Sequence, residues 1–510
     1  MSVNIQSIIT VGNSGMVIDT ECHLSNGLPA IVIVGLGGKA VDEAKERIRG
    51  AFAQSKVQLP RKRITINLAP ADIPKESTSL DLAIAAAILQ SSKQTKQLIA
   101  KNEAVIGELG LIGDVRSVRG IIGKILAGKK AGIDTFFIPS DNLQQAMLIP
   151  RINIVPVKNI QELYQHLNST KELPVYRTEE GSSPSAISSA PAQEYRVADI
   201  VGQQRAKRAL EIAAAGGHNL LLNGPPGTGK SMLAKALPSV LPALTREEML
   251  EVTHLHSLAG NNSEDPVTTR PFRAPHHSAS HIAIVGGGHN LRPGEISLSH
   301  RGVLFVDELP EFNRVALEAL RQPLEDRIIT VSRAKDTAIY PAHFILVATA
   351  NPCPCGYWGT DKPCRCAAHH VLQYRRKLSG PIMDRIDLCV DVEPIDHDQL
   401  LRTNTTNNLD QHIRKKVGAA RAAQSKRYGQ ATKLNADISN RTIKTKSGIT
   451  DDALALLNEA AKRLDISARS YMRIIKVART IADLDDSAST DTTHITEALQ
   501  YRPRNLQIID

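Results

Sequence analysis

Residues 219–231 read NLLLNGPPGTGKS, in which a short apolar run leads into the pattern G-x-x-x-x-G-K-[ST]. The helix-forming sequence MLAKAL follows at once. Glycines between a buried strand and a helix N-terminus let successive backbone N–H groups surround phosphate oxygens. The pattern therefore predicts a phosphate-binding loop, in which Lys230 neutralises phosphate charge and Ser231 reaches Mg²⁺. The predicted loop residues are Gly224, Pro225, Pro226, Gly227, Thr228, Gly229, Lys230 and Ser231.

Two other short apolar runs end close to polar residues. Residues 303–306 are followed by Asp307 and Glu308, and the run 344–348 ends three residues before Asn351. A carboxylate at the end of a buried strand can hold Mg²⁺ through water, and the next carboxylate can deprotonate an attacking water. We therefore expect Asp307 to hold Mg²⁺, Glu308 to act as the base and Asn351 to position the water. For Asn351 the alternative is a turn residue before a proline.

These elements occur together with GEISLSHRGVLFVDELPEF at 294–312, NPCPCG at 351–356 and SGPIMDRIDL at 379–388. In this order they resemble the magnesium-chelatase-like branch of AAA+ ATPases, and most closely the ComM/YifB family. The resemblance covers essentially the whole chain. It implies an α/β AAA+ core with a parallel sheet, a helical C-terminal lid, ATP with Mg²⁺ as ligands, and a homo-hexameric ring.

The same resemblance implies roles for arginines outside the phosphate loop. Arg385 matches the family's arginine finger, which enters the ATP site of the neighbouring subunit. Arg469 matches the second sensor of the lid, which contacts the γ-phosphate, and Arg473 is the alternative for that role. Solvated arginines on a helix surface remain the other interpretation of Arg385 and Arg469.

Length and composition indicate several folded domains. At roughly 150 residues per domain, 510 residues correspond to about three. Residues 176–194 are rich in Ser, Pro, Ala and Gly, which predicts a flexible linker between a domain at 1–175 and the ATPase core at 195–400. Residues 401–510 form the predicted helical lid. Within the first domain, the run IVIV at 31–34 predicts a buried strand.

The N-terminal domain resembles the proteolytic domain of Lon-type ATPases through residues 74–79 and 107–120. In that family a serine attacks and a lysine acts as its base. Ser79 occupies the serine position, but Ile122 occupies the lysine position, and Lys124, two residues further on, would point to another face. We therefore expect an α+β domain that is used for binding or assembly and is not a protease.

Four of the six cysteines lie within 14 residues, as two C-x-C pairs. Four thiolates so close in sequence can close a tetrahedral zinc site, and nearby Pro and Gly residues allow the chain to turn back. The favoured interpretation is a structural zinc loop, with free reduced thiols as the alternative. Its predicted ligands are Cys353, Cys355, Cys364 and Cys366.

The net charge of +10 is compatible with a polyanionic partner. Residues 327–340 alternate in a way that predicts a β-hairpin with Arg333 and Lys335 near its tip. In the resembling helicase rings such a hairpin projects into the pore, where cations follow a nucleic-acid backbone. The alternative is a solvated hairpin whose charges prevent edge pairing. A second candidate loop spans residues 270–291.

The longest uncharged apolar run, 82–89, is well short of the roughly 20 residues that a membrane span needs. With no basic leader at the start, a cytoplasmic protein without membrane contact is expected. The leading hypothesis is an ATP-dependent hexameric DNA motor, a helicase or branch-migration enzyme for single-stranded or branched DNA in the recombination of transforming DNA. The competing hypotheses are a metal-chelatase motor subunit and a protein-remodelling ring.

Overall fold

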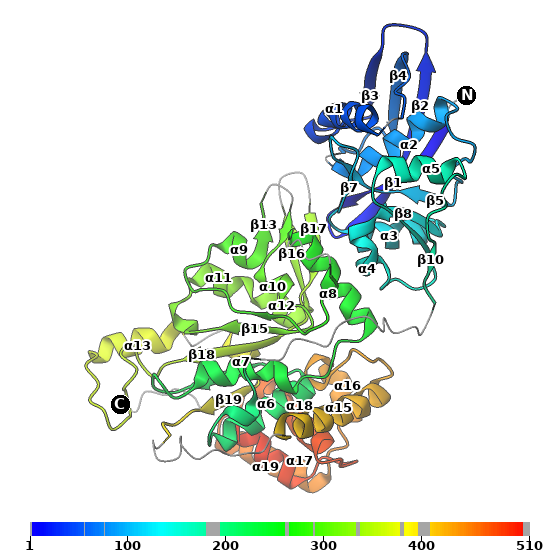
Figure 1. The fold of residues 1–510 in the computed structure, drawn as a ribbon. Helices are drawn as coiled ribbons and strands as arrows, with labels where there is room; N and C mark the ends of the chain where they lie inside the picture. The colour runs from blue at the N-terminus through cyan, green and yellow to red at the C-terminus, as the bar shows by residue number, and fades with distance from the viewer. Residues whose placement is uncertain are drawn as a thin grey trace.

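Three parts follow one another along the chain: a mixed N-terminal domain, a central α/β domain and a C-terminal helical lid (Figure 1). The computed structural model describes residues 3–55, 57–75, 77–179, 194–260, 265–288, 291–332, 337–377, 382–395 and 408–502 of the chain. The predicted fold class, a parallel α/β core with a helical C-terminal region and a mixed N-terminal domain, is confirmed.

The N-terminal domain, blue and cyan in Figure 1, is built on an eight-stranded sheet. Its strands lie in the order β10-β9-β8-β5-β1-β2-β4-β3. Their bounds are Val3–Val11 (β1), Ser14–Ser25 (β2), Ala30–Val34 (β3), Arg63–Ala69 (β4), Glu103–Val105 (β5), Thr135–Pro139 (β8), Asn153–Val157 (β9) and Tyr176–Arg177 (β10). A separate two-stranded pair joins β6 (Glu108–Leu109) to β7 (Val115–Arg116).

Helices cover both faces of this sheet. They are α1 (Lys39–Gln54), α2 (Asp81–Ser91), α3 (Ile121–Lys130), α4 (Leu143–Ala146) and α5 (Ile160–Leu167). Ile5 and Ile9 of β1 belong to one core with α1, α2 and α5, whereas Ile8 belongs to a second core with α3 and α4. This follows from the period of two along a strand, which sends alternate side chains to opposite faces.

The strand predicted at residues 31–34 forms, but it lies at the edge of the sheet. β3 is the last strand in the order, only Ile31 within it is buried, and Val34 is 44% exposed. The prediction of a buried strand is wrong because an apolar run has the same sequence signature at an edge as in the interior.

The central domain contains a five-stranded parallel sheet in the order β12-β15-β18-β11-β19. The strands are β11 (Leu220–Asn223), β12 (Phe272–Arg273), β15 (Val303–Val306), β18 (Ile345–Ala350) and β19 (Leu388–Asp391). The helices are α6 (Gln204–Gly216), α7 (Lys230–Val240), α8 (Arg246–Ala259), α9 (His281–Val285), α10 (Glu295–Leu298), α11 (Arg314–Ala319), α12 (Arg321–Asp326) and α13 (Ala368–Lys377). Two hairpins pair β13 (Gly286–Gly287) with β14 (Arg292–Pro293) and β16 (Ile328–Ser332) with β17 (Thr337–Pro341).

Both faces of the central sheet are covered, as its continuous apolar strands predict. Leu220 and Leu222 pack in a core with α6, α7 and the lid, whereas Leu221 packs in a second core with α11 and α12. The lid consists of α15 (Leu409–Tyr428), α16 (Asn440–Lys446), α17 (Asp451–Arg463), α18 (Ala468–Leu484) and α19 (Thr492–Gln500). Because Val417 and Ile475 of the lid belong to the first core, the lid is fixed to the sheet by shared apolar packing.

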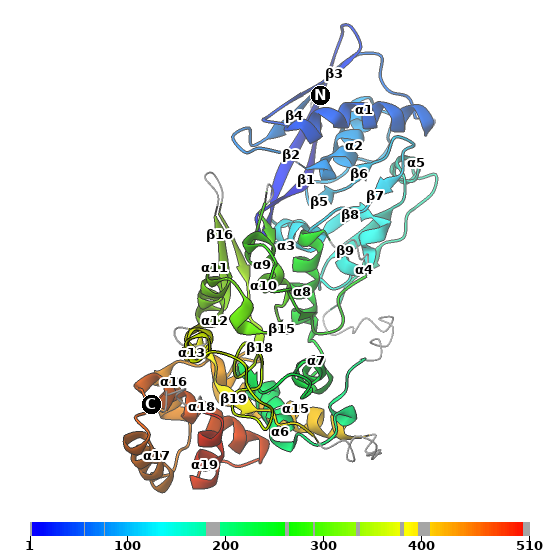
Figure 2. The ribbon, with the colours of Figure 1, turned by 90° about the vertical axis from the view of Figure 1, so that its left-hand side faces the viewer.

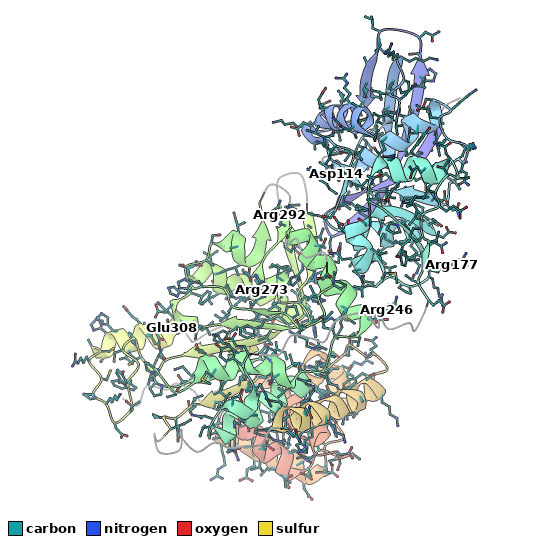
Figure 3. The ribbon with its side chains drawn as sticks, in the orientation of Figure 1. Asp114, Arg177, Arg246, Arg273, Arg292 and Glu308 are labelled. Atoms are coloured by element: carbon teal, nitrogen blue, oxygen red, sulfur yellow. The ribbon has the colours of Figure 1, made fainter. Side chains whose placement is uncertain are left out.

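Helix α8 connects the central domain to the N-terminal domain, as Figure 2 shows from the side. His254 hydrogen-bonds Asn13 O at 2.9 Å, and the Gly120 N–H donates to Ser257 Oγ at 2.8 Å. At the start of the helix, Arg246 (Figure 3) donates to the carbonyl of Leu148 at 2.8 Å. None of the helices within the described ranges is long and apolar enough to cross a membrane.

Candidate ATP site

The phosphate loop joins β11 to α7 and has the backbone that its glycines predict. Gly227 and Gly229 adopt left-handed conformations, with φ of 82° and 86°, which side chains with a Cβ rarely permit. A Cβ added at either position would meet no atom within 4 Å, so the loop borders open space. An open turn of this kind at the start of the 11-residue helix α7 fits the phosphates of a nucleotide.

Lys230 is folded back onto the loop. Its Nζ donates to the carbonyls of Gly224 at 2.6 Å and Pro225 at 2.8 Å, and to Asn351 Oδ1 at 3.1 Å. Burial lowers the pKa of Lys230, although nearby carboxylates oppose that effect. The structure thus brings the predicted lysine and the predicted amide into direct contact, although β11 and β18 are far apart in sequence.

The acidic pair follows β15 at the same edge of the sheet, and Figure 3 labels Glu308 there. Ser231 Oγ lies 3.3 Å from Asp307 Oδ2. Thr349 Oγ1 donates to Asp307 Oδ1 at 2.6 Å and accepts the backbone N–H of Glu308 at 2.8 Å. A serine hydroxyl beside a carboxylate at a phosphate loop is a donor set that fits Mg²⁺ with nucleotide phosphates. Sequence reasoning missed Thr349, because threonine is common in strands and its presence in one indicates no further role.

The four clustered cysteines meet at one point, with their sulfur atoms all within 4.8 Å of one another. The Sγ of Cys353 is 3.4 Å from that of Cys355 and 3.7 Å from that of Cys364. A tetrahedron with Zn–S bonds near 2.3 Å requires sulfur atoms about 3.8 Å apart. The backbone N–H of Trp358 also donates to Cys353 Sγ at 3.3 Å, a contact that suits a thiolate. The geometry therefore fits a closed metal site formed by Cys353, Cys355, Cys364 and Cys366.

The cysteine loop packs directly on the phosphate loop. Gly356 has φ of 86°, and a Cβ there would lie 2.4 Å from Pro226 Cδ. Glycine is required at this position both for its backbone conformation and for the close approach. The cysteine loop and the phosphate loop are thus in van der Waals contact.

Arg385 and Arg469 meet on a shared partner, Glu325. Their Nη2 atoms lie 2.6 Å and 2.5 Å from the same oxygen, Oε1. Arg473, the alternative sensor, instead donates through Nη1 to Ile386 O at 2.5 Å. Sequence reasoning missed Glu325, since an acid at the end of a short helix is indistinguishable from a solvated one.

This arginine cluster and the phosphate loop lie at opposite ends of the parallel strands. We call the side of the sheet where the strands end its carboxyl edge, and the side where they begin its amino edge. β11 and β19 run parallel with Leu220 opposite Leu388 and Asn223 opposite Asp391. The phosphate loop follows the carboxyl end of β11, whereas Arg385 precedes the amino end of β19. The four-residue strands span about 13 Å at roughly 3.3 Å per residue. The predicted cations therefore do not meet the phosphate loop of their own chain.

Comparison with known proteins agrees with this architecture. Residues 196–400 match the family described as magnesium chelatase, subunit ChlI, and residues 409–502 match its C-terminal family. Residues 20–142 match subunit ChlI of Mg-chelatase. Competence protein ComM of Haemophilus influenzae is 42% identical over 500 residues, covering 98% of this chain and 97% of that protein. The chain belongs to the ComM/YifB family of magnesium-chelatase-like AAA+ proteins.

Other relatives define how far the family likeness extends. The protein YifB of Salmonella typhimurium is 40% identical over 487 residues, covering 95% of this chain and 94% of that protein. A Lon protease of Aster yellows witches'-broom phytoplasma is 34% identical over 107 residues, which cover 20% of this chain and 13% of that protein. Membership of the ComM/YifB family implies ATP and Mg²⁺ as ligands and ATP hydrolysis as the reaction, whereas the likeness to Lon is partial.

The Lon-like part of this ComM/YifB member does not form a serine–lysine dyad within the described residues. Ser79 is buried, and its hydroxyl bonds Ile8 O at 3.2 Å and the hydroxyl of Ser77 at 2.8 Å. Lys124 is buried as well, and its Nζ donates to Arg119 O at 2.9 Å. Burial lowers the pKa of Lys124 to about 7. The lysine position itself holds the fully buried Ile122.

The predicted hairpin forms, with β16 and β17 antiparallel and Ser332 opposite Thr337, and it projects from the central domain in Figure 2. Arg333 and Lys335, the predicted DNA contacts, lie outside the described residues. In the second candidate loop, Arg273 is bound to Glu295 at 2.6 Å, so its charge is already paired.

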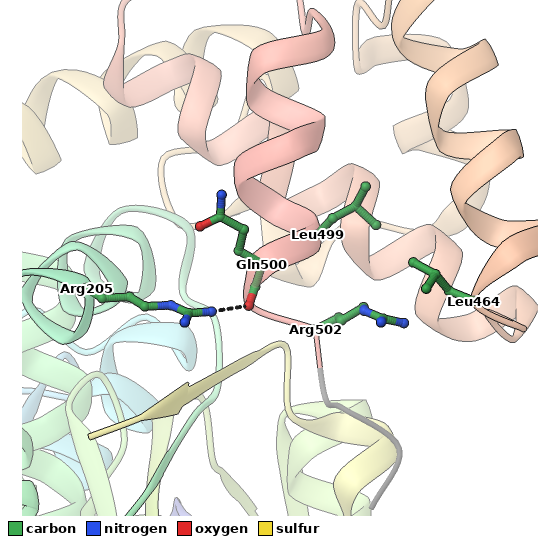
Figure 4. Close-up of a pocket in the computed structure, with 5 residues that line it drawn as sticks. All are labelled: Arg205, Leu464, Leu499, Gln500 and Arg502. Carbon is green, nitrogen blue, oxygen red and sulfur yellow. Dashed lines mark hydrogen bonds between the residues drawn. The ribbon is translucent and has the colours of Figure 1, made fainter. Parts of the chain in front are cut away.

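A surface hollow of about 440 Å³ lies where α6 meets the lid (Figure 4). Across it, Arg205 donates to Gln500 O at 2.6 Å. None of its lining residues is a predicted ATP-site residue. They are Arg205, Leu464, Leu499, Gln500 and Arg502.

Proposed function

We propose that this ComM/YifB member is one subunit of a hexameric ATP-driven motor that moves on DNA. Its activity would be helicase or branch migration during the recombination of transforming DNA. The observation that carries the proposal is the separation of the phosphate loop and the arginine cluster onto opposite edges of one sheet. Because one chain cannot bring them together, a complete site needs the phosphate loop of one copy and the arginines of another. One relative is named a competence protein, which agrees with this role.

Residues at the carboxyl edge bind ATP and accept the proton of the attacking water. In this proposal residues 224–231 bind the phosphates of ATP, and Lys230 exchanges its contacts with the loop carbonyls for phosphate oxygens. Ser231 and Asp307 hold Mg²⁺, which neutralises phosphate charge when bound. Glu308 accepts the proton of the attacking water, which Asn351 orients.

The amino edge supplies charge stabilisation to the neighbouring copy. Arg385 and Arg469 would approach the γ-phosphate bound by the next subunit, where fixed cations stabilise the charge that develops during transfer. A ring of identical subunits provides this arrangement at every interface, because each interface then joins one carboxyl edge to one amino edge.

The hairpin of β16 and β17 supplies the DNA contact. Arg333 and Lys335, which lie between the two strands in sequence, would follow the phosphate backbone, a contact that gives affinity without sequence preference. Lys335→Ala should weaken DNA binding at every sequence and reduce the slope of log K against log salt by about one. Unchanged salt dependence would remove Lys335 from the interface.

The cysteine loop holds structural zinc in this proposal. Elemental analysis of protein purified without chelator should find one zinc per chain, and Cys364→Ser should lose it. Since Gly356 packs on Pro226, removal of zinc should also weaken ATP binding. If the wild-type protein contains no metal, the zinc proposal is wrong and the four cysteines are reduced thiols.

The motor function is tested by comparing ATP hydrolysis without DNA, with single-stranded DNA and with a four-way junction. We expect stimulation by DNA and ATP-dependent branch migration of the junction, both absent in Lys230→Ala. Lack of stimulation would favour a chelatase-type or protein-remodelling ring. Branch migration that persists in Lys230→Ala would contradict the proposal.

A further inference from the structure

Glu325 is the meeting point of two guanidinium groups that belong to different parts of the molecule. It lies next to the end of α12 in the central domain. Arg385 comes from the 3-10 turn Met383–Arg385 that precedes β19, and Arg469 comes from the first turn of the lid helix α18. Both bind the same carboxylate oxygen, at 2.6 Å and 2.5 Å.

This geometry brings two positive charges close together. Since both Nη2 atoms bind one oxygen, they can be no more than about 5 Å apart. Like charges at that distance repel, and the carboxylate between them offsets the repulsion. The hydrogen bond from Arg385 and the nearby charge of Arg469 lower the pKa of Glu325, so the carboxylate is ionised at neutral pH.

Further hydrogen bonds hold the chain around Arg385 and Arg469 in place. Asn219 donates to Arg385 O at 2.8 Å, next to the start of β11. Arg473 donates through Nη1 to Met383 O at 3.2 Å and to Ile386 O at 2.5 Å, and through Nη2 to Ser470 Oγ at 3.0 Å. The lid helix and the turn before β19 are therefore joined by hydrogen bonds from the Arg473 side chain to backbone carbonyls, and Glu325 joins the side chains of Arg385 and Arg469.

We propose that Glu325 is a positioning residue that holds Arg385 and Arg469 side by side, so that one chain presents both to the ATP bound by its neighbour. This inference rests on the proposed function, in which those arginines act across subunits. A guanidinium group carries five N–H donors, so it can bind a carboxylate and phosphate oxygens at the same time. Holding both cations in place before the reaction reduces the reorganisation needed in the transition state.

The first test compares Glu325→Gln with Glu318→Gln. The two glutamates are equally exposed, at 45% and 46%, but Glu318 pairs with the exposed Arg314 one turn away. Glu325→Gln should lower kcat for ATP hydrolysis by at least about tenfold and leave the affinity for a non-hydrolysable ATP analogue within about twofold. Glu318→Gln should leave both unchanged. Glu325→Asp, which keeps the charge, should recover part of the lost kcat. An unchanged kcat in Glu325→Gln would overturn the proposal.

The second test assigns Glu325 to one side of the shared site by mixing variant subunits. A mixture of Arg385→Ala with Lys230→Ala serves as the reference, because each variant supplies the half that the other lacks. Glu325→Gln should regain hydrolysis when mixed with Lys230→Ala and should regain none when mixed with Arg385→Ala.

The outcomes separate the two proposals. If the reference mixture regains no hydrolysis, the shared site of the proposed function fails, whatever Glu325 does. If the reference mixture recovers but Glu325→Gln recovers with Arg385→Ala, or recovers with neither partner, Glu325 does not position the arginines. A merely structural defect would give the last result.

Discussion

The two edges of the central sheet differ in how complete they are within one chain. At the carboxyl edge, Lys230 contacts Asn351, Ser231 lies beside Asp307, and Thr349 joins the acidic pair. At the amino edge, two arginines bind a carboxylate of their own chain, whereas the proposal requires them to reach a phosphate. In the proposed function, therefore, binding of ATP belongs to the single chain, whereas rapid hydrolysis depends on assembly.

The largest effect on ATP hydrolysis is expected for Arg385→Ala. Loss of an arginine finger should lower kcat by about a thousandfold, because the charge developing on the transferred phosphate loses its cation. Since Arg385 lies at the edge away from its own phosphate loop, binding of a fluorescent ATP analogue to the same variant should be unchanged. Weakened binding together with slow hydrolysis would mean that Arg385 serves its own chain.

Glu308→Gln, a change at the carboxyl edge, should lower kcat by about a hundredfold, because the amide cannot accept the proton of water. The variant should still bind ATP and retain it, which rapid filtration can measure. Asp326→Asn, next to the arginine cluster, serves as an acidic control at the opposite edge. Normal turnover in Glu308→Gln would remove that residue from the role of base.

Thr349→Val tests the contacts at the carboxyl edge and should lower the rate of ATP hydrolysis by about tenfold. Valine has the shape of threonine but can neither donate to Asp307 nor accept the N–H of Glu308. The concentration of Mg²⁺ needed for half-maximal hydrolysis should rise, and Thr349→Ser should restore it. An effect of equal size in the serine variant would indicate altered packing and not a lost hydroxyl.

Lys124→Met should have the smallest effect on hydrolysis, since Lys124 lies in the N-terminal domain away from both edges. Its pKa of about 7, against an ordinary 10.5, means that between these values the unfolded chain binds a proton that the native domain does not. The stability of the domain should therefore rise from pH 7 to pH 9 in the wild type.

Hydrogen exchange of the α3 amides, corrected for intrinsic rates, measures this pH dependence. Lys124→Met should show higher protection at pH 7 and a weaker dependence on pH. The exposed Lys130 on the same helix supplies the control variant, Lys130→Met. A pH dependence unchanged by Lys124→Met would place its origin elsewhere.

The sequence predicted the carboxyl edge far better than the amino edge, for a physical reason. Parallel strands end at a common edge, so polar residues that follow three apolar runs are expected to meet there on sequence grounds alone. The position of Arg385 depends on β19, a four-residue strand without a distinctive signature, and was not predictable without that strand. Glu325 and Thr349 were missed because their roles arise from tertiary contacts between residues distant in sequence.

The N-terminal domain shows a similar limit. The alternation of apolar and polar residues at 63–68 predicts a half-buried strand, and β4 has the alternating burial pattern that this requires. The apolar run at 31–34 predicts a buried strand, although β3 is an edge strand. Apolar content alone therefore identifies a strand but does not give its place in the sheet.

The contacts of α8 with both domains couple its orientation to the position of the N-terminal domain. Its 14 residues are anchored to the N-terminal domain at Asn13, Gly120 and Leu148, while Leu255 packs in the core of the central sheet. The helix is thus held by both domains, and the edge strand β3 lies at the end of the N-terminal domain that is far from α8 (Figure 2). A small tilt of α8 would sweep that end through a much larger arc.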